Sequence, residues 1–314
     1  MPLHPETIAV LQLIKDSGRP PLHTLSAAEA RETSARSRAI MQPAPPEVAL
    51  VQDLTCPGPH GEIRLRHYRG AGTADDAMLP GVVFFHGGGW VIGDLESHDQ
   101  VCRALANYAQ CSVVAVDYRM APEHVFPAAV DDSVAAYAWV CAQAEALRID
   151  ARRIAVAGDS AGGNLATVVA LAARDGAAPL PCFQWLVYPA VDMAAATPSC
   201  ERVQEGFILT QATMKWFIGH YITDAADIND WRASPIRAAS LAGLPPALIL
   251  TCHFDPLADE GIAYAQRLNN EGVRVQHVHM NDQMHAFLTM GKFIGASDMA
   301  IRHAAVALRD AWRA

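Results

Sequence analysis

The segment Arg153-Ile-Ala-Val-Ala-Gly-Asp-Ser-Ala-Gly-Gly-Asn164 leads from a short apolar run into a helix-like stretch through a turn that is rich in glycine. Its centre, Gly158-Asp-Ser-Ala-Gly162, has the pattern Gly-x-Ser-x-Gly, which places a reactive serine on a sharp turn between a strand and a helix. Such a turn strains the backbone at the serine, and side chains two positions away on either side would collide, so both positions need glycine. The start of the following helix would also stabilise negative charge that develops beside the serine. We therefore predict that Ser160 is a nucleophile.

From residue 81 onward, the chain alternates between short apolar runs and helix-like stretches. Such runs, when helices separate them, are typical of parallel strands that are buried on both faces. The expected parallel strands span residues 81–85, 112–116, 153–157, 183–187, 247–251 and 273–279. Two further strands, at 48–54 and 62–68, flank a Pro-Gly-Pro turn and form an expected antiparallel pair. The predicted fold class is α/β, with a doubly wound, mostly parallel sheet of about eight strands.

Two helices are expected before the sheet. Ile8, Leu11 and Ile14 recur at helical spacing, which predicts the first helix. Ser26-Ala-Ala-Glu29 has the pattern of a capping box and predicts the start of the second, which the proline-rich stretch 42–46 ends.

One connection in the second half of the chain is unusually long. Roughly fifty residues separate Val191 from Leu244, where a crossover between parallel strands needs far fewer. This stretch includes an apolar, helix-like run at 214–221 and is interpreted as an inserted cap. The expected division of the chain is a first cap part at 1–45, a first core part at 46–192, an inserted cap segment at 193–243 and a second core part at 244–314.

A second glycine-rich loop, Val82-Val-Phe-Phe-His-Gly-Gly-Gly-Trp90, directly follows a predicted buried strand. Amides without side chains can approach a tetrahedral intermediate closely and donate hydrogen bonds to its oxyanion. We predict that Gly87 and Gly88, together with Ala161, form an oxyanion hole, although a flexible turn would have the same composition. His86 is expected to brace this loop.

The base is expected in a loop after the last strand, because the fold that carries this serine turn has the chain order serine, acid, histidine. His285, in Asn281-Asp-Gln-Met-His-Ala-Phe287, is the histidine in such a loop. The other downstream histidines considered fall in the last strand, the C-terminal helix or the cap: His277, His279, His303 and His220.

The acid is expected after the preceding strand, where Asp255 comes first. Asp259 and Glu260 follow it and open the next helix, where acidic side chains favour the helix N-terminus. Asp282 is an alternative, but it lies only three residues from His285. Asp159 is expected to hold the serine turn rather than to take part in catalysis.

Several of these motifs together resemble the bacterial hormone-sensitive-lipase-like carboxylesterases, also called family IV esterases and lipases, which have the α/β-hydrolase fold. The matching motifs, in the family's order, are His86-Gly-Gly-Gly89, Asp117-Tyr-Arg-Met-Ala-Pro-Glu-His124, Gly158-Asp-Ser-Ala-Gly162, Asp255-Pro-Leu-Ala-Asp-Glu-Gly261 and His285-Ala-Phe287. The sequence departs from the family at Ala286, where glycine is usual, at His253, where glutamate is frequent, and at 281–284, which lacks the common Pro-Gly.

The resemblance implies a serine carboxylesterase that hydrolyses small esters with short to medium acyl chains and needs neither a metal nor an organic cofactor. It is also compatible with a homodimer formed through the edge of the last strand. In the predicted reaction Ser160 forms an acyl-enzyme, His285 acts as the base and Asp255 orients it. The expected substrate-contacting side chains are Trp90, Phe207, Ile208, Leu209 and Trp216, of which those in the cap could equally form packing core.

Two alternatives stay open from the sequence. One is a non-catalytic ligand-binding receptor on the same fold, against which His285 argues. The other is a different acyl hydrolase, namely an amidase, a deacetylase or a true lipase, because no local motif separates these activities.

Composition limits the other function classes. The net charge of −9 disfavours binding to nucleic acid, and no cationic run is present that would hold the chain on an anionic membrane surface. The apolar stretch 238–254 is interrupted by glycine and proline, so no membrane insertion is expected. Seven scattered cysteines without a Cys-x-x-Cys pair, and an N-terminus without a signal-like pattern, predict reduced thiols and a cytoplasmic location. His277 and His279 are the only tight pair of candidate metal ligands, and no metal site is expected from them.

Overall fold

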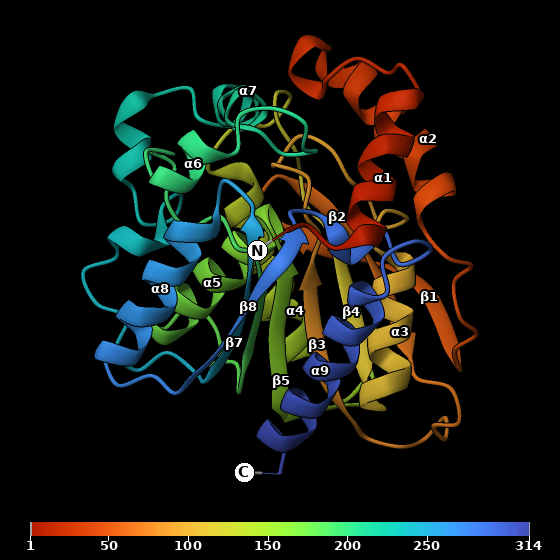
Figure 1. Cartoon of the computed structure of the whole chain (residues 1–314). Coiled ribbons are helices and arrows are strands. Elements are labelled where there is room, and N and C mark those ends of the chain that lie inside the picture. Colours follow the sequence, from red (N-terminus) through yellow and green to blue (C-terminus); the bar gives the residue numbers. More distant parts are fainter. Residues whose placement is uncertain (1, 314) are drawn as a thin grey trace.

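A computed structural model, which describes residues 2–313, contains an eight-stranded sheet in the order β1-β2-β4-β3-β5-β6-β7-β8 (Figure 1). Strands β1 and β2 form an antiparallel pair, β2 is antiparallel to β4, and all other neighbours are parallel. The strands are β1 (Leu50–Gly58), β2 (Gly61–Arg69), β3 (Leu79–Phe85), β4 (Ser112–Asp117), β5 (Ile149–Asp159), β6 (Gln184–Val187), β7 (Ala247–Phe254) and β8 (Val275–Met284). The predicted mostly parallel α/β sheet is confirmed.

The last strand differs from its predicted span. It continues to Met284, whereas the sequence pattern ended it at residue 279 and placed 281–284 in a loop. Strand β8 lies at the edge of the sheet, where one side of the strand is free of neighbours and polar residues such as Asn281 are tolerated. As a result, His285 follows the strand directly rather than standing inside a loop.

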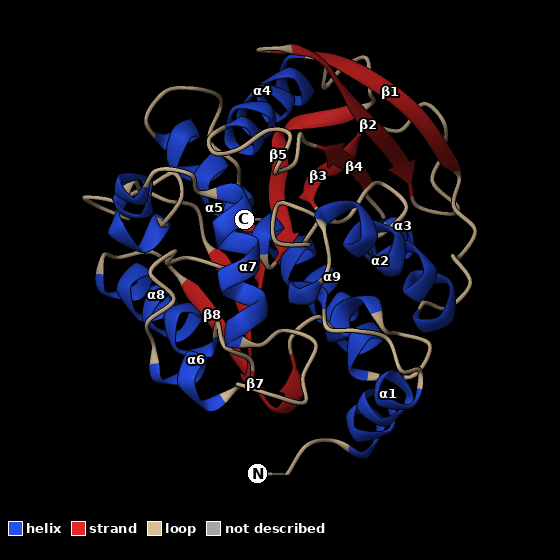
Figure 2. Cartoon of the chain, turned by 90° about the horizontal axis from the view of Figure 1, so that it is seen from above, coloured by secondary structure: helices blue, strands red, loops and turns tan. Residues whose placement is uncertain are grey.

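Helices cover both faces of the sheet, as Figure 2 shows from above. On one side lie α4 (Ala128–Ala142), α5 (Ala161–Arg174) and α8 (Ala258–Asn270), and on the other lie α3 (Asp99–Ala109) and α9 (Ala296–Ala311). Successive residues of a strand point to opposite faces, so Val83 and Phe85 join the core beside α4, α5 and α8 while Val82 and Phe84 join the core beside α3 and α9. Both faces of the central strands are therefore buried.

The remaining helices lie above the end of the sheet toward which the parallel strands run (Figure 1). They are α1 (Pro5–Asp16), α2 (Ala27–Met41), α6 (Pro198–Arg202) and α7 (Gln211–Tyr221), with short 3₁₀ turns at Leu22–Thr24, Ala225–Asn229, Pro235–Arg237 and Phe287–Thr289. The predicted capping box is present, because Ser26 Oγ accepts the amide of Glu29 and Glu29 Oε2 accepts the amide of Ser26. No helix within residues 2–313 is long and apolar enough to cross a membrane.

The last part of the predicted insertion, 193–243, packs directly on the core. The side-chain amide of Asn164 in α5 donates to the carbonyls of Ala190 and Ala233, at 2.9 and 2.8 Å. The amide of Ile236 donates to the carbonyl of Val191 at 3.1 Å. These bonds fasten the insertion close to the strand end from which it departs.

Candidate active site

Ser160 occupies the turn between β5 and α5 in a conformation that is rare for residues with a side chain. Its φ is +55° and its ψ is −119°. A Cβ added to Gly158 would collide with the carbonyl of Gly162, and one added to Gly162 would collide with the carbonyl of Phe85. The glycines are thus required by the close approach of backbone segments, and the strained turn lifts the Ser160 side chain clear of the sheet.

The structure brings the three predicted reactive side chains into one chain of contacts. His285 Nε2 lies 2.9 Å from Ser160 Oγ, and His285 Nδ1 lies 2.7 Å from Asp255 Oδ2. Asp255 has no exposed surface, and its second oxygen accepts the amide of Leu257 at 2.8 Å. The three residues follow β5, β7 and β8, whose carboxyl ends meet at one edge of the sheet.

The other acidic candidates contact different groups. Asp259 Oδ2 accepts the amide of Ser199 at 2.7 Å, and Glu260 Oε1 accepts the amides of Val191 and Asp192 at 2.7 and 3.1 Å. Both stand in the first turn of α8, as predicted, but Asp259 fastens the insertion and Glu260 fastens the residues that lead into it, rather than serving only their own helix. Burial raises the pKa of Glu260 well above its ordinary value.

The contacts of the glycine loop disagree with the predicted role of Gly87 as an oxyanion donor. The amide of Gly87 donates to Asp159 Oδ1 at 2.8 Å, so Gly87 is not free to bind an oxyanion. Across residues 2–313, the amides of Gly88, Gly89 and Ala161 donate to no protein acceptor. Three consecutive glycines look alike in sequence, and only the position of the Asp159 carboxylate separates the first from the other two.

Asp159 holds both the serine turn and the glycine loop. Besides accepting from Gly87, its Oδ1 lies 2.9 Å from His98 Nε2, and both side chains are buried. Burial alone would raise the pKa of Asp159, but the His98 ring and the Gly87 amide together bring it below the ordinary value. The carboxylate is therefore ionised at neutral pH, which suits it to accept the Gly87 amide and to lie beside the His98 ring. Sequence reasoning missed His98, for which the only signal was a histidine at the start of a helix.

Two aromatic contacts support the site. The His86 ring stacks on Tyr118 with centroids 4.4 Å apart, and Tyr118 Oη donates to the His86 carbonyl at 2.6 Å. Burial lowers the pKa of His86, and its Nδ1 contacts the Gly87 carbonyl at 2.8 Å, in agreement with a bracing role. Tyr188, which sequence reasoning also missed, lies with its ring 4.4 Å from that of His285. A tyrosine directly after a buried strand was the only signal for it.

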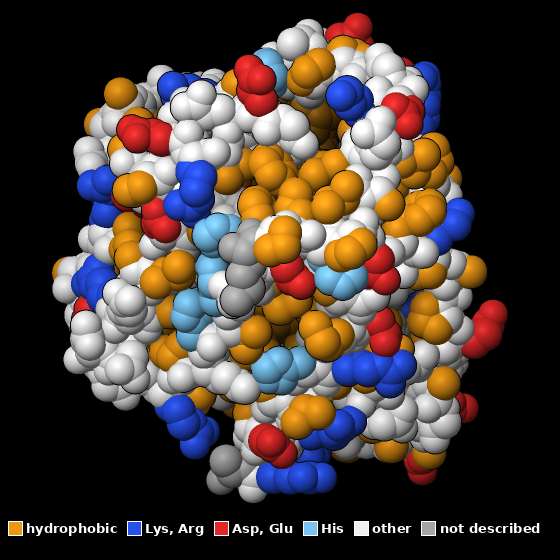
Figure 3. Space-filling model, viewed as in Figure 1, with side chains coloured by type: hydrophobic (Ala, Val, Ile, Leu, Met, Phe, Trp, Pro, Cys, Tyr) orange, Lys and Arg blue, Asp and Glu red, His pale blue; other side chains and the backbone are white. Residues whose placement is uncertain are grey.

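A cavity of about 920 Å³ reaches Ser160 and His285 from the surface. Figure 3 shows hydrophobic side chains gathered between the N-terminal helices and the segment that carries α6 and α7. Of the predicted substrate-contacting residues, three line this cavity: Phe207, Ile208 and Leu209. The cavity lining within the described chain does not include Trp90 or Trp216.

Both tryptophans have packing roles instead. Trp90 is 3% exposed and stacks on Tyr221 with centroids 4.5 Å apart. Trp216 meets the ring of its neighbour Phe217 edge-on at 5.0 Å. Of these residues, Phe217 lines the cavity. The prediction that Trp90 and Trp216 contact substrate is wrong for this structure, because residue type alone does not tell which side of a cap helix or loop faces the cavity.

Histidines on β8 form polar contacts of their own. His277 Nε2 and His279 Nδ1 each lie 2.8 Å from Thr251 Oγ1. Among residues 2–313, no group of three or more histidine, cysteine or acidic side chains is arranged to hold a metal ion.

A serine on a strained turn at the carboxyl edge of a mostly parallel sheet, reached there by a histidine and an acid from the last two strands, defines a protein of the α/β-hydrolase class. The sequence profile described as the alpha/beta hydrolase fold matches residues 82–289. The chain belongs to the hormone-sensitive-lipase-like family of this fold, which confirms the resemblance seen in the sequence.

Individual relatives cover most of the chain. The carboxylic ester hydrolase LipN of Mycobacterium tuberculosis is 44% identical over 283 residues, which are 88% of this chain and 74% of LipN. The ethyl acetate hydrolase of Pseudomonas putida is 40% identical over 309 residues, which are 95% of this chain and 96% of that protein. A solved ester hydrolase from the metagenome of Lake Arreo, complexed with a derivative of bipyridine phosphonate, is 42% identical, has a TM-score of 0.95, and matches over 99% of this chain and 100% of its own.

Proposed function

We propose that this chain is a serine carboxylesterase that hydrolyses short- to medium-chain carboxylic esters through an acyl-enzyme on Ser160. The observation that carries the proposal is the position of His285, with one ring nitrogen 2.9 Å from Ser160 Oγ and the other 2.7 Å from Asp255. This spacing allows a proton to pass from the serine to the imidazole while the carboxylate fixes the tautomer and orientation of the ring.

The first half of the reaction forms the acyl-enzyme. Ser160 Oγ attacks the ester carbonyl carbon as His285 Nε2 accepts the serine proton. The carbonyl oxygen becomes an oxyanion. It accepts hydrogen bonds from the free amides of Gly88 and Gly89 in the glycine loop and of Ala161 at the start of α5. The bond to the alcohol then breaks, and His285 returns the proton to the departing alkoxide oxygen.

The second half releases the acid. Water attacks the acyl carbon and gives a proton to His285, the same amides hold the second oxyanion, and the Ser160 oxygen leaves and regains its proton. The products are one carboxylic acid and one alcohol, and the enzyme returns to its starting state.

A small, largely apolar ester fits the site. The side chains of Phe207, Ile208 and Leu209 line the cavity beside the reactive serine. Two of the relatives are named for hydrolysis of carboxylic esters, one of them for ethyl acetate. These features favour esters of short to medium acyl chain over amides, acetylated sugars and long triglycerides.

The decisive experiment combines activity with covalent labelling. An organophosphonate should add to the wild-type chain once, and peptide mapping should place it on Ser160. Ser160→Ala should lose both the label and nearly all ester hydrolysis, because removal of a triad serine lowers kcat by about a millionfold. Retained hydrolysis in Ser160→Ala would exclude the mechanism. If the wild-type chain neither reacts with the organophosphonate nor hydrolyses any ester, the result would instead support a ligand-binding receptor on the same fold.

A panel of substrates separates the acyl hydrolases. Aryl esters of increasing chain length, one anilide and one acetylated sugar should give a specificity constant that is highest for an ester of two to about eight acyl carbons. Faster turnover of the anilide or the acetylated sugar would assign the site to an amidase or a deacetylase.

Two further expectations belong with this proposal. All seven cysteines are free in the structure, which supports a reducing compartment such as the cytoplasm. Strand β8 lies at an edge of the sheet, and the family resemblance makes that edge the expected interface of a homodimer.

A further inference from the structure

One face of the N-terminal helix α2 is fastened to the segment that continues from the oxyanion loop. Arg31 and Arg38 of α2 and Gln42, which directly follows the helix, are spaced seven and four residues apart and so lie along one side of it. Arg31 Nε donates to the Val91 carbonyl at 2.8 Å, Arg38 Nη1 to Asp94 Oδ1 at 2.8 Å, and Gln42 Nε2 to the Ser97 carbonyl at 2.6 Å. Helix α2 thus contacts residues 91–97 at three successive points.

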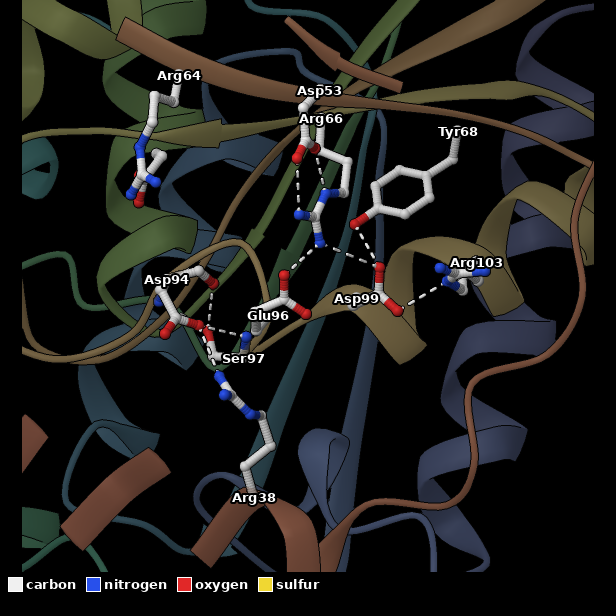
Figure 4. Close-up of polar contacts among 11 residues, drawn as sticks. Arg38, Asp53, Arg64, Arg66, Tyr68, Asp94, Glu96, Ser97, Asp99 and Arg103 are labelled. Atoms are coloured by element: carbon white, nitrogen blue, oxygen red, sulfur yellow. Dashed lines mark hydrogen bonds and ion pairs between the residues drawn. The ribbon is translucent and has the colours of Figure 1, made fainter. Parts of the chain in front are cut away.

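The point that Arg38 contacts is a tight turn closed by its own side chains (Figure 4). Asp94 Oδ1 accepts the amide of Ser97 at 2.7 Å, and Ser97 Oγ contacts the amide and the carbonyl of Asp94 at 3.0 and 2.6 Å. The same Asp94 oxygen receives Arg38. A movement of the Arg38 guanidinium therefore displaces the turn through the oxygen that closes it.

The turn is also held from the sheet. Arg66, on β2, donates to Glu96 at 2.7 Å and pairs with Asp53 on β1, as Figure 4 shows. Residues 94–97 therefore lie between an arginine from the cap and an arginine from the core, and neither contact involves the reactive residues.

From this turn, short contacts lead to the oxyanion loop. Ser97 Oγ lies 2.9 Å from His98 Nδ1, and His98 Nε2 lies 2.9 Å from Asp159 Oδ1, without the alignment of a linear hydrogen bond. The same Asp159 oxygen accepts the amide of Gly87 at 2.8 Å. Gly87 immediately precedes Gly88, and Asp159 immediately precedes Ser160. Asp159 is therefore the point at which a contact from the cap reaches both the glycine loop and the serine turn.

We propose that Arg38, acting through Asp94, Ser97, His98 and Asp159, is a positioning residue that couples the docking of α2 to the geometry of the oxyanion hole. The inference rests on the proposed esterase function. An oxyanion hole stabilises the transition state only when its donors are held in place beforehand, so a loosened Gly87 amide misplaces the donors that follow it. Substrate binding in the ground state does not require those donors, which separates the predicted effect on kcat from an effect on KM.

The central test replaces Arg38 by glutamine and compares it with a matched change on the same helix. Arg38→Gln removes the charge that reaches Asp94. Arg36→Gln removes a comparable arginine on the exposed side of α2, whose only ion pair within residues 2–313 is with Glu32. We expect kcat of Arg38→Gln to fall about tenfold with KM within about twofold, a smaller loss than the hundredfold or more that removal of an oxyanion donor causes. Arg36→Gln should keep the wild-type kcat.

The affinity of a transition-state analogue provides a second measurement, which would not change if Arg38 only stabilised the fold. A trifluoromethyl ketone adds to the serine and forms an oxyanion, so its affinity for Arg38→Gln should fall by the same factor as kcat. Arg38 also borders the cavity, and loss of a direct substrate contact would raise KM and leave kcat unchanged. An increase in KM at constant kcat would therefore overturn the proposal.

His98, near the other end of the series of contacts that begins at Arg38, provides a second variant. His98→Asn should lower kcat at least as much as Arg38→Gln, and the double variant should lose no more than His98→Asn alone, because both changes interrupt one path. Additive losses would overturn the coupling. Arg38→Lys, which keeps the charge, should restore part of kcat.

Failure of this proposal and failure of the esterase assignment have different signatures. If wild-type chain hydrolyses esters but Arg38→Gln matches it in kcat and inhibitor affinity, only the coupling is wrong. If circular dichroism finds Arg38→Gln unfolded, Asp94→Asn carries the test, because the amide oxygen still accepts from Ser97 while the charge that attracts Arg38 is gone, and an unchanged kcat would again overturn the proposal.

Discussion

Asp255 Oδ2 lies 2.7 Å from His285 Nδ1, although the two residues are 30 positions apart in the sequence. The carboxylate is fully buried and His285 is 6% exposed, so water does not compete for this contact. The two residues meet because each directly follows one of two neighbouring parallel strands, β7 and β8. Asp282, the alternative acid from the sequence, lies within β8 rather than after the end of a strand.

Replacement of Asp255 by asparagine should lower kcat by about ten-thousand-fold while the chain stays folded, because the amide favours the wrong imidazole tautomer. Steady-state hydrolysis of an aryl acetate measures the effect, and circular dichroism checks the fold. Asp282→Asn is the control and should keep kcat within about twofold. Equal losses in the two variants would contradict the assignment of the acid.

The cavity lining predicts which cap side chains set acyl-chain preference. Ile208→Trp places more volume in the cavity and should lower kcat/KM for an aryl hexanoate about tenfold more than for the acetate, within the range that one or two methylene groups produce in an apolar pocket. Trp216→Phe, which changes a ring packed against Phe217, should leave the hexanoate-to-acetate ratio unchanged. A shift of that ratio in Trp216→Phe alone would reverse the two roles.

Two glycines with open space around them should respond to alanine in opposite directions. Gly219 lies in helix α7 with an ordinary helical backbone, so Gly219→Ala should raise the free energy of unfolding by about 1 kcal/mol. Gly176 has φ +99°, which disfavours any side chain, so Gly176→Ala should lower it by about 1 kcal/mol. Urea unfolding of both variants measures the change, and a gain at both positions would show that backbone conformation does not decide the outcome.

Acid should weaken the fold through His67. Burial, with the charge of Arg69 adding to it, lowers the pKa of His67 to about 4 from its ordinary value of 6.5. Below pH 6.5 the imidazole of His67 binds a proton in the unfolded chain but stays neutral in the folded chain. The stability contributed by neutral His67 is therefore complete above pH 6.5 and is lost as the pH falls toward 4. Between pH 7 and pH 5 this group accounts for about 2 kcal/mol of lost stability.

His67→Gln should remove that pH dependence. Urea unfolding measures the free energy of unfolding at pH 7 and at pH 5. The decrease between these two pH values should be about 2 kcal/mol smaller for the variant than for the wild type. His60→Gln, on the exposed turn of the same hairpin, should follow the wild type at both pH values. If His67→Gln and wild type respond identically to pH, His67 binds its proton equally well in the folded and the unfolded chain, and burial does not lower its pKa.

Much of the fold, and the meeting of Ser160, His285 and Asp255, was predictable, because local patterns specify them. Apolar runs that alternate with helices predicted the parallel sheet, the capping box at Ser26 predicted the start of α2, and Gly158 and Gly162 predicted the turn at Ser160. Parallel strands place their carboxyl ends at one edge, so residues that follow strands could be predicted to meet.

The sequence by itself therefore determined the class of fold, and it predicted the turn at Ser160 and the placement of Asp255 and His285 beside it, since each depends on residue type and on position relative to a strand. Only the tertiary structure decided that Gly87 is bound to Asp159, that Trp90 and Trp216 pack away from the cavity, and that Arg38 reaches the oxyanion loop through His98. These contacts join segments far apart in the chain. Which donor is already satisfied, and which side chain faces a cavity, depends on how those segments pack, and no periodicity within one segment encodes it.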